Sequence, residues 1–117
     1  MVFTFNENVI DLGVAYSWGF GKNGALGHGD TENRISPCKI SFLANKVLTA
    51  DCGSQHTGFI TAEGKIYMCG ANHIGQLGIK LKEPQMLPTL MQGISEPASQ
   101  VACGVTHTLI LLSKIDI

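Results

Sequence analysis

The amino-acid sequence predicts an all-β fold made of β-propeller blades, and three observations support this prediction. A segment rich in special residues is repeated 51 residues further along the chain. Short segments with the composition of strands follow one another at roughly ten-residue spacing, separated by glycine or proline. No long stretch has the 3.6-residue period of an amphipathic helix. Repeats of about 50 residues that contain short strands are typical of the four-stranded blades of propellers.

The repeat is defined by two motifs that recur in a single register. Gly19–Gly27 corresponds to Gly70–Gly78, and Cys52–Thr57 corresponds to Cys103–Thr108. Aligned without a gap, the two copies share 12 identical residues in 51 positions, mostly glycine, leucine, histidine, proline and cysteine. The chain has neither the Trp-Asp dipeptide of WD repeats nor the glycine doublet of kelch repeats, so it belongs to neither of those propeller types.

The first copy of the repeat predicts two strands. Val14–Trp18 ends at Gly19, where the first motif begins. Pro37–Ile40 begins at a proline, which suits an edge strand because proline has no N–H group for a strand ladder.

The central part of the chain predicts a complete set of four strands. Val47–Cys52 is short, mostly apolar and stops at a glycine. Thr57–Thr61 is β-branched and aromatic, the turn residues Ala62-Glu63-Gly64 follow it, and Lys65–Cys69 alternates between two faces, which together indicate a hairpin. Leu87–Met91 carries a proline near its start and is expected to be the outer strand.

The C-terminal part begins the same plan again. Gln100–Cys103 and His107–Leu112 correspond to the first two strands of the central set. We therefore expect one repeat region over residues 1–117, with a first repeat at about 13–63 and a second at about 64–114.

Composition limits the class of protein further. A chain of 117 residues is one domain or less, and 44% hydrophobic residues suffice for a core. Eight Lys+Arg against nine Asp+Glu give a net charge of −1, so we expect no nucleic-acid surface on this segment. No apolar run is long enough to predict a membrane span. The four cysteines form no C-x-x-C pair, which favours reduced, mostly buried thiols and a cytoplasmic or nuclear protein.

We expect no catalytic residue, cofactor, metal ion or small-molecule substrate. Gly19–Gly24 matches G-x-G-x-x-G, but no helix is expected after it, as a dinucleotide site would require. His56 and His107 recur at one point of each copy, which favours a hydrogen-bonding strut because a catalyst is needed only once. Cys52 and His56 have the spacing of metal ligands, but a glycine turn separates them. The following acidic residues are interpreted as solvated turn residues: Asp30, Glu32, Asp51 and Glu63.

These motifs resemble a known repeat family. Residues 50–78, which begin Ala-Asp-Cys-Gly-Ser-Gln-His-Thr, are similar almost throughout to the RCC1-like repeat of the regulator of chromosome condensation family, with Cys69 in the usual place of a tryptophan. Residues 101–112 restart the pattern and residues 9–27 match its second half. The resemblance covers nearly the whole chain and implies blades of a propeller with roughly seven blades, of which this chain would hold about two.

Two repeats cannot close such a ring, so we expect both ends of the array to expose strand edges and apolar blade faces. Our preferred interpretation is a fragment of a longer regulatory protein. One alternative is self-association, or assembly with another chain, through the open blade edges. The other is a stable short array, which is disfavoured because about three repeats are normally needed.

The absence of a catalytic pattern favours a module for protein–protein interaction. Loops between propeller strands are exposed while a rigid scaffold fixes their positions. We expect the contacts with a protein partner to come from loop residues that differ between the copies. These are Phe20, Lys22 and Asn23 in the first copy and, in the second, Asn72 and His73 with their neighbours Ala71 and Ile74.

The family resemblance implies an alternative function, guanine-nucleotide exchange on a small GTPase of the Ran type. The founding family member inserts a wedge from one blade, whereas the connections after Gly27 and Gly78 have similar lengths in this chain. Chromatin association is a third hypothesis that the family name implies, and the near-zero net charge does not support it.

Overall fold

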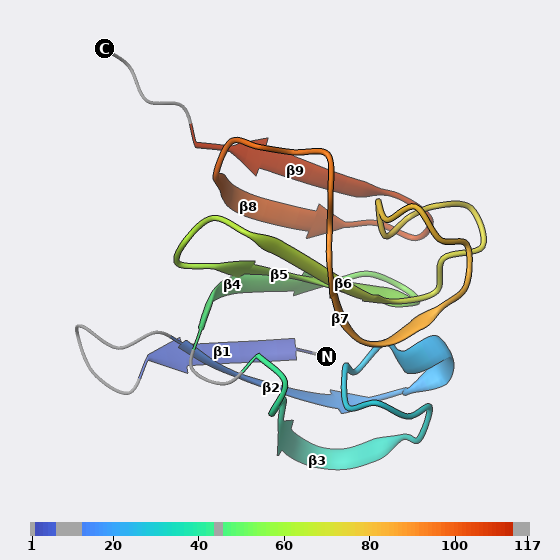
Figure 1. The fold of residues 1–117 in the computed structure, drawn as a ribbon. Helices are drawn as coiled ribbons and strands as arrows, with labels where there is room; N and C mark the ends of the chain where they lie inside the picture. Colours follow the sequence, from blue (N-terminus) through green and yellow to red (C-terminus); the bar gives the residue numbers. More distant parts are fainter. Residues whose placement is uncertain (1, 7–12, 44–45, 114–117) are drawn as a thin grey trace.

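The computed structural model of the chain describes residues 2–6, 13–43 and 46–113 (Figure 1). Within these residues every regular element is a β-strand except one short 3-10 helix, η1. No helix in the described part of the chain is long and apolar enough to cross a membrane. The elements in chain order are β1 (Val2–Asn6), β2 (Gly13–Gly19), η1 (Lys22–Gly24), β3 (Arg34–Lys39), β4 (Val47–Cys52), β5 (His56–Thr61), β6 (Ile66–Gly70), β7 (Gln85–Leu90), β8 (Ala98–Cys103) and β9 (Thr108–Leu112).

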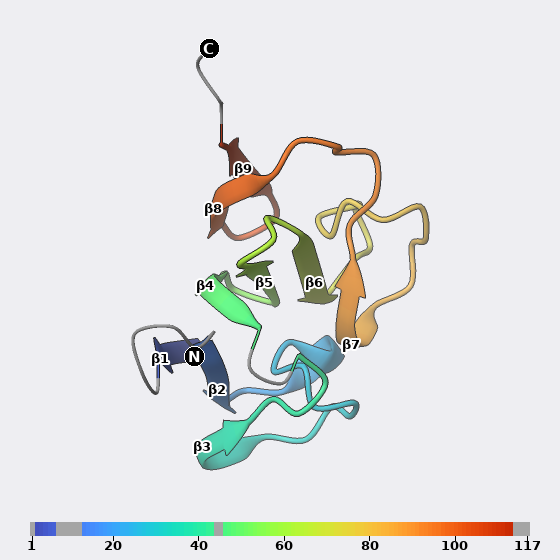
Figure 2. The ribbon, with the colours of Figure 1, turned by 60° about the vertical axis from the view of Figure 1, so that its left-hand side comes forward.

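The strands form three successive antiparallel groups. β4, β5, β6 and β7 pair in sequence order and make one complete four-stranded blade. β1, β2 and β3 make a three-stranded group before it, joined to β4 by a single pairing of Gly13 with Val47. β8 and β9 form a separate hairpin after it. Figures 1 and 2 show the groups stacked in this order along the molecule, so about two propeller blades are present.

All eight strands expected from the sequence are present. β3 begins three residues before the expected strand, and β7 and β8 begin two residues before theirs. The tight turn between β5 and β6 is also confirmed, because the N–H of Gly64 donates to the carbonyl oxygen of Thr61 at 2.9 Å. β1 is an additional strand, which pairs with β2 from Val2↔Ser17 to Asn6↔Gly13.

The core consists of two apolar clusters, one on each side of the complete blade. Neighbouring residues of a strand point to opposite faces, so Phe59 and Ile60 of the fully buried strand β5 belong to different clusters. The first cluster lies between the β1–β3 group and the blade and contains Ala15, Ile40, Leu43, Val47, Phe59 and Cys69. The second lies between the blade and the β8–β9 hairpin and contains Ile60, Ile66, Met68, Leu77 and Ala98.

The strand ends repeat with the same backbone geometry in both copies. Gly19 and Gly70, which end β2 and β6, both have φ of 111°. A Cβ atom on Gly70 would meet the carbonyl oxygen of Gln55, so this position needs glycine for both its backbone angle and its space. The equal angles show that the 51-residue sequence repeat is also a structural repeat.

Candidate functional site

Two loops at the same end of neighbouring blades form the candidate site. The first loop (residues 20–33) follows β2 and includes η1, and the second loop (residues 71–84) follows β6. Both lie on the right-hand side of Figure 1, where β2 and β6 end. Because the loops start at equivalent points of the repeat, they present equivalent positions at the same end of consecutive groups of strands.

The first loop is held in one shape by polar contacts at its base. The hydroxyl of Ser17 donates to the carbonyl oxygen of Leu26 at 2.6 Å and accepts from Nε2 of His28 at 2.9 Å. The N–H of Gly21 donates to Oδ1 of Asn33 at 2.9 Å. Partial burial lowers the pKa of His28, so its imidazole is neutral near pH 7. The backbone of this loop is therefore fixed before any partner binds.

An ion pair fixes the far side of the first loop. Nη2 of Arg34 lies 3.0 Å from Oδ2 of Asp30, and the same guanidinium lies 3.6 Å from Glu32. The hydrogen bond from Arg34 lowers the pKa of Asp30. Asp30, which we expected to be a solvated turn residue, is a partly exposed loop residue whose carboxylate also joins the loop to the first residue of β3.

The second loop is organised by the side chain of Asn72. Its Nδ2 donates to the carbonyl oxygens of Leu81 at 2.6 Å and Glu83 at 3.1 Å. Its Oδ1 accepts from the N–H of Leu77 at 3.3 Å. One buried amide therefore joins the two ends of this loop.

Each loop also binds the second strand of the following group. The hydroxyl of Thr57 on β5 donates to the carbonyl oxygen of Ala25 in the first loop at 2.7 Å. At the equivalent place, Thr108 on β9 donates to the carbonyl oxygen of Gln76 in the second loop at 2.7 Å. The loops are thus rigid links between groups as well as exposed surfaces.

His56 has the structural role that the sequence predicts. Its side chain is fully buried, and Nε2 lies 2.9 Å from Oγ1 of Thr108 and 3.1 Å from the carbonyl oxygen of His107. Because the Thr108 hydroxyl already donates to Gln76, it accepts here, so Nε2 of His56 carries the proton. His56 is thus a strut between consecutive repeats.

Asp51 provides a second strut that the sequence interpretation missed. Its Oδ2 accepts from the N–H of Cys103 at 2.8 Å, across the boundary between the blade and the next hairpin. We expected a solvated turn residue, whereas Asp51 is a partly buried residue of β4. The equivalent position in the second copy, Ala102, is apolar, so the repeat gives no signal for this role. Desolvation, together with nearby Asp51, raises the pKa of Cys103 to about 12, so this thiol is not a nucleophile near neutral pH.

The five predicted contact residues are not equivalent in the structure. Phe20 is 67% exposed, and Lys22 and His73 are also exposed. Asn23 is partly buried and takes φ of 63° inside η1. Asn72 is only 1% exposed, so the structure places it inside the second loop rather than on its surface. The exposed part of the site therefore comprises Phe20, Lys22 and His73, with Ile74 beside His73.

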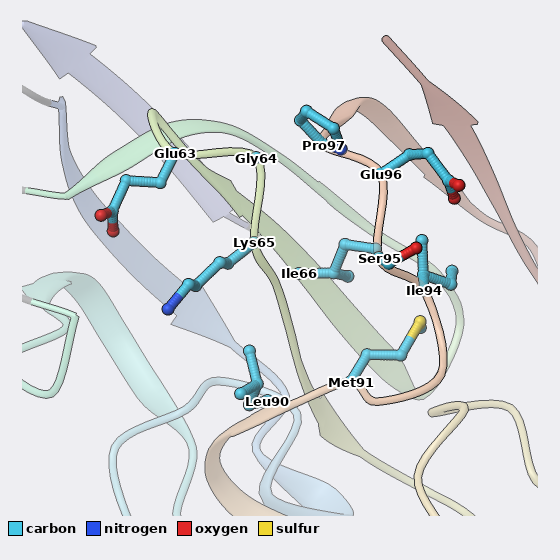
Figure 3. A pocket seen from close by; sticks show the side chains of 10 residues that line it. All are labelled: Glu63, Gly64, Lys65, Ile66, Leu90, Met91, Ile94, Ser95, Glu96 and Pro97. Carbon is cyan, nitrogen blue, oxygen red and sulfur yellow. The ribbon is translucent and has the colours of Figure 1, made fainter. Parts of the chain in front are cut away.

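A hollow of about 250 Å³ lies at the turn between β5 and β6, among the residues that Figure 3 labels. Its middle is apolar, with Ile66, Met91 and Ile94. The carboxylates of Glu63 and Glu96 point away from each other, so they do not form an acid pair. No group of three His, Cys, Asp or Glu side chains in residues 2–6, 13–43 and 46–113 is arranged to hold a metal ion.

The sequence comparisons agree with the repeat geometry. The family model described as "Regulator of chromosome condensation (RCC1) repeat" matches residues 13–60 and 63–111. The human probable E3 ubiquitin-protein ligase HERC3 is 34% identical over 99 residues, which are 83% of this chain and 9% of that protein. The ultraviolet-B receptor UVR8 of Arabidopsis thaliana is 34% identical over 107 residues, 90% of this chain and 24% of that protein. The chain thus spans a quarter or less of these relatives.

Solved structures have the same architecture. The crystal structure of human WBSCR16 superposes with a TM-score of 0.73 at 28% identity, covering 86% of this chain and 27% of that chain. The crystal structure of Prp20p from Saccharomyces cerevisiae, described with its binding properties to Gsp1p and histones, gives a TM-score of 0.74 at 15% identity and covers 94% and 33%. At that identity the second comparison shows the fold alone. Both support propeller blades as the architecture of this chain.

Proposed function

Because the chain belongs to the regulator of chromosome condensation (RCC1) repeat family, we propose that its first and second loops form one protein-binding surface on a propeller segment. The chain carries about two blades of that family's propeller, a fold whose named relatives include regulators and receptors. The observation that carries the proposal is the exposure of Phe20, 67%, on a loop whose base is fixed by hydrogen bonds. A large aromatic side chain held outward by a rigid backbone is a typical anchor of protein interfaces.

Differences between the two loops support recognition of a specific partner. Scaffold positions such as Leu26 and Leu77 are identical and buried in both copies. The tip positions Lys22 and His73 correspond in the repeat, yet they differ in chemistry and both are exposed. Exposed loop residues that do not stabilise the scaffold can differ between copies, and they are available for contact with a partner. The four thiols are free cysteines, which supports a place for the module in the cytoplasm or nucleus.

Binding measurements on the 117-residue chain test this proposal. The probes are Gsp1p and histones, the proteins named with the Prp20p structure, each measured by biolayer interferometry against the immobilised chain. We expect Phe20→Ala to weaken the binding of at least one probe about tenfold or more, and His73→Ala to weaken it less. Lys65→Ala is the matched control, because Lys65 is exposed and precedes β6, whereas the second loop follows the other end of that strand. Equal affinities for wild type, Phe20→Ala and Lys65→Ala, or no binding of any probe, would contradict the proposal.

Guanine-nucleotide exchange is the finer alternative for the same surface. It would require the chain to release nucleotide from a bound GTPase as well as to bind it. Residues 20–33 and 71–84 give loops of matching length, with no additional hairpin that could act as a wedge. A release assay with fluorescent GDP on a panel of small GTPases distinguishes the two functions, because a binding module leaves the release rate unchanged.

A further inference from the structure

β3 carries a serine followed by a proline at the point where its pairing with β2 is interrupted. Residues 35–37 of β3 stand opposite the single residue of β2 between Ser17 and Gly19, so the strand bulges out of the ladder here. Pro37 favours this bulge because it has no N–H group for the ladder. It also restricts the residue before it, Ser36, to extended backbone. The chain thus holds Ser36 in an extended segment that leaves the sheet.

The side chain of Ser36 is exposed on this bulge, and so are those of its two neighbours. The backbone is held locally, because the Cys38 thiol donates to the carbonyl oxygen of Ser36 at 3.3 Å. β7 has the same bulge over residues 86–88, where the N–H of Gly29 in the first loop donates to the carbonyl oxygen of Met86 at 2.9 Å.

The second copy shows that this exposure belongs to the repeat position. Leu87 is the residue equivalent to Ser36, 51 positions later. The first loop lies directly beside Leu87, yet Leu87 is still 43% exposed. A neighbouring loop therefore leaves this position accessible, and the exposure of Ser36 does not depend on what stands before the chain.

The residues around Ser36 have the pattern that proline-directed protein kinases phosphorylate. These kinases take a serine or threonine followed directly by proline, because their cleft has an apolar pocket for the proline ring. Those of the cyclin-dependent type also favour a basic residue three positions after the serine. Ser36-Pro37-Cys38-Lys39 has both features, and Lys39 is exposed. No other serine or threonine in the sequence is followed by proline.

We propose that Ser36 is a phosphorylation site for a proline-directed serine/threonine kinase, and that the phosphate draws Arg34 away from Asp30. In the transfer, Oγ of Ser36 attacks the γ-phosphorus of ATP, the bond from that phosphorus to the bridging oxygen breaks, and ADP leaves. The hydroxyl proton passes to the catalytic aspartate of the kinase. The product carries a charge of about −1.5 to −2 near pH 7.

Arg34 links this phosphate to the first loop. Its guanidinium lies 3.0 Å from the carboxylate of Asp30 and 3.6 Å from that of Glu32. Cα atoms two residues apart in a strand are roughly 6.6 Å apart, so a phosphate on Ser36 is within reach of this long side chain. Phosphate binds guanidinium through two parallel hydrogen bonds and carries more charge than one carboxylate. Phosphorylation should therefore release the far side of the first loop from its ion pair.

The first test is incubation of the folded 117-residue chain with ATP and a purified cyclin-dependent kinase, followed by mass spectrometry. We expect one added phosphoryl group on Ser36 and none on the Ser36→Ala chain. Ser95 is the internal control, because it is exposed but precedes a glutamate and should stay unmodified. Lys39→Ala should slow the transfer about tenfold, as expected for the loss of one contact to a charged group.

A peptide of residues 31–43 is the unfolded reference for the same kinase. The bulge already presents Ser36, so the folded chain should be modified at a rate within about tenfold of the peptide rate, without local unfolding. A rate about a hundredfold or more below that of the peptide would mean that Ser36 is reached only by unfolding, and it overturns the proposal. Modification of other residues alone, or of neither substrate, overturns it as well.

The second test follows the ion pair through Asp30. The hydrogen bond from Arg34 lowers the pKa of Asp30, so an NMR titration should show a higher Asp30 pKa in the phosphorylated chain. Kinase-treated Ser36→Ala should keep the lowered value. Arg34→Ala should raise the Asp30 pKa without phosphate, and phosphorylation of that chain should then change it little. An unchanged pKa in the phosphorylated wild type, or an equal rise with and without Arg34, overturns the withdrawal of Arg34.

Both measurements are made without a binding partner, so their outcomes are independent of the loop surface. The first loop also carries Phe20. A change in partner binding on phosphorylation is a further expectation, and it alone rests on the proposed function.

Discussion

At the scale of single residues, His56 determines how two repeats meet. Its Nε2–H group faces Thr108 and the carbonyl oxygen of His107, while Nδ1 is buried without a partner among the described residues. Protonation of Nδ1 would add a charge and a donor with no acceptor. Burial accordingly lowers the pKa of His56 from 6.5, with a smaller opposing contribution from the hydrogen bond to His107.

This lowered pKa predicts a stability that falls in mild acid. The unfolded chain binds a proton at His56 below about pH 6.5, whereas the folded chain resists it, so the free energy of unfolding decreases as the pH falls from 7.5 to 5.5. His28, whose pKa is also lowered by burial, acts in the same direction. Urea titrations at each pH measure the effect. His56→Gln, which keeps an N–H donor but does not titrate, should show a weaker pH dependence; an equal slope would contradict this role.

Gly70 predicts a second effect at residue scale. Gly70→Ala combines φ of 111° with a Cβ that would meet Gln55 O and would lie 2.7 Å from the Cα of His56. We expect a loss of about 2–4 kcal/mol in the free energy of unfolding. Gly75→Ala is the control, because Gly75 also has positive φ but nothing lies within 4 Å of its Cβ position; it should lose only about 1–2 kcal/mol. Similar losses for both variants would show that close packing at Gly70 is unimportant.

At the scale of elements, the loops are the parts that join one group of strands to the next. The hydrogen bonds Thr57 to Ala25 and Thr108 to Gln76 have the same length, 2.7 Å, and the same place in the repeat. The loop after β2 and the loop after β6 therefore act as structural braces as well as surfaces.

Removal of one such bond should destabilise the chain. Thr57→Val keeps the side-chain shape but leaves the Ala25 carbonyl oxygen without the Thr57 hydroxyl, at a site where Thr57 is buried. We expect a loss of about 1–2 kcal/mol in the free energy of unfolding. Thr31→Val, at an exposed position of the first loop, is the control and should change stability by less than about 0.5 kcal/mol. A Thr57→Val chain as stable as the control would show that the bond contributes nothing net.

Strand positions could be predicted from the sequence because each strand depends on local composition. The sequence pattern of each strand also occurs in both copies of the repeat. β1 could not be predicted, because it lies outside the repeat register and pairs with β2 by tertiary contact alone. Within the site, the exposure of Phe20 followed from its variable loop position. The burial of Asn72 could not be predicted. The sequence does not show whether an asparagine side chain binds carbonyl groups of its own loop, as Asn72 does, or faces solvent.

At the scale of the whole molecule, one complete blade lies between two incomplete groups. The blade is covered on both faces by apolar clusters, but β9 presents Leu109 and Leu111 to solvent. In repeat proteins, stability is approximately a sum over units and the contacts between neighbours. An added neighbour should therefore stabilise the last hairpin most.

The central position of β5 has a consequence for the order in which backbone amides exchange with deuterium. Its six residues, His56–Thr61, are all buried between paired strands and two clusters, so their amides should open only with the blade as a whole. β9 has no second paired strand among the described residues, and exchange in this part of the chain should begin there and proceed inward. Backbone amides of the last hairpin would thus exchange before those of the central blade.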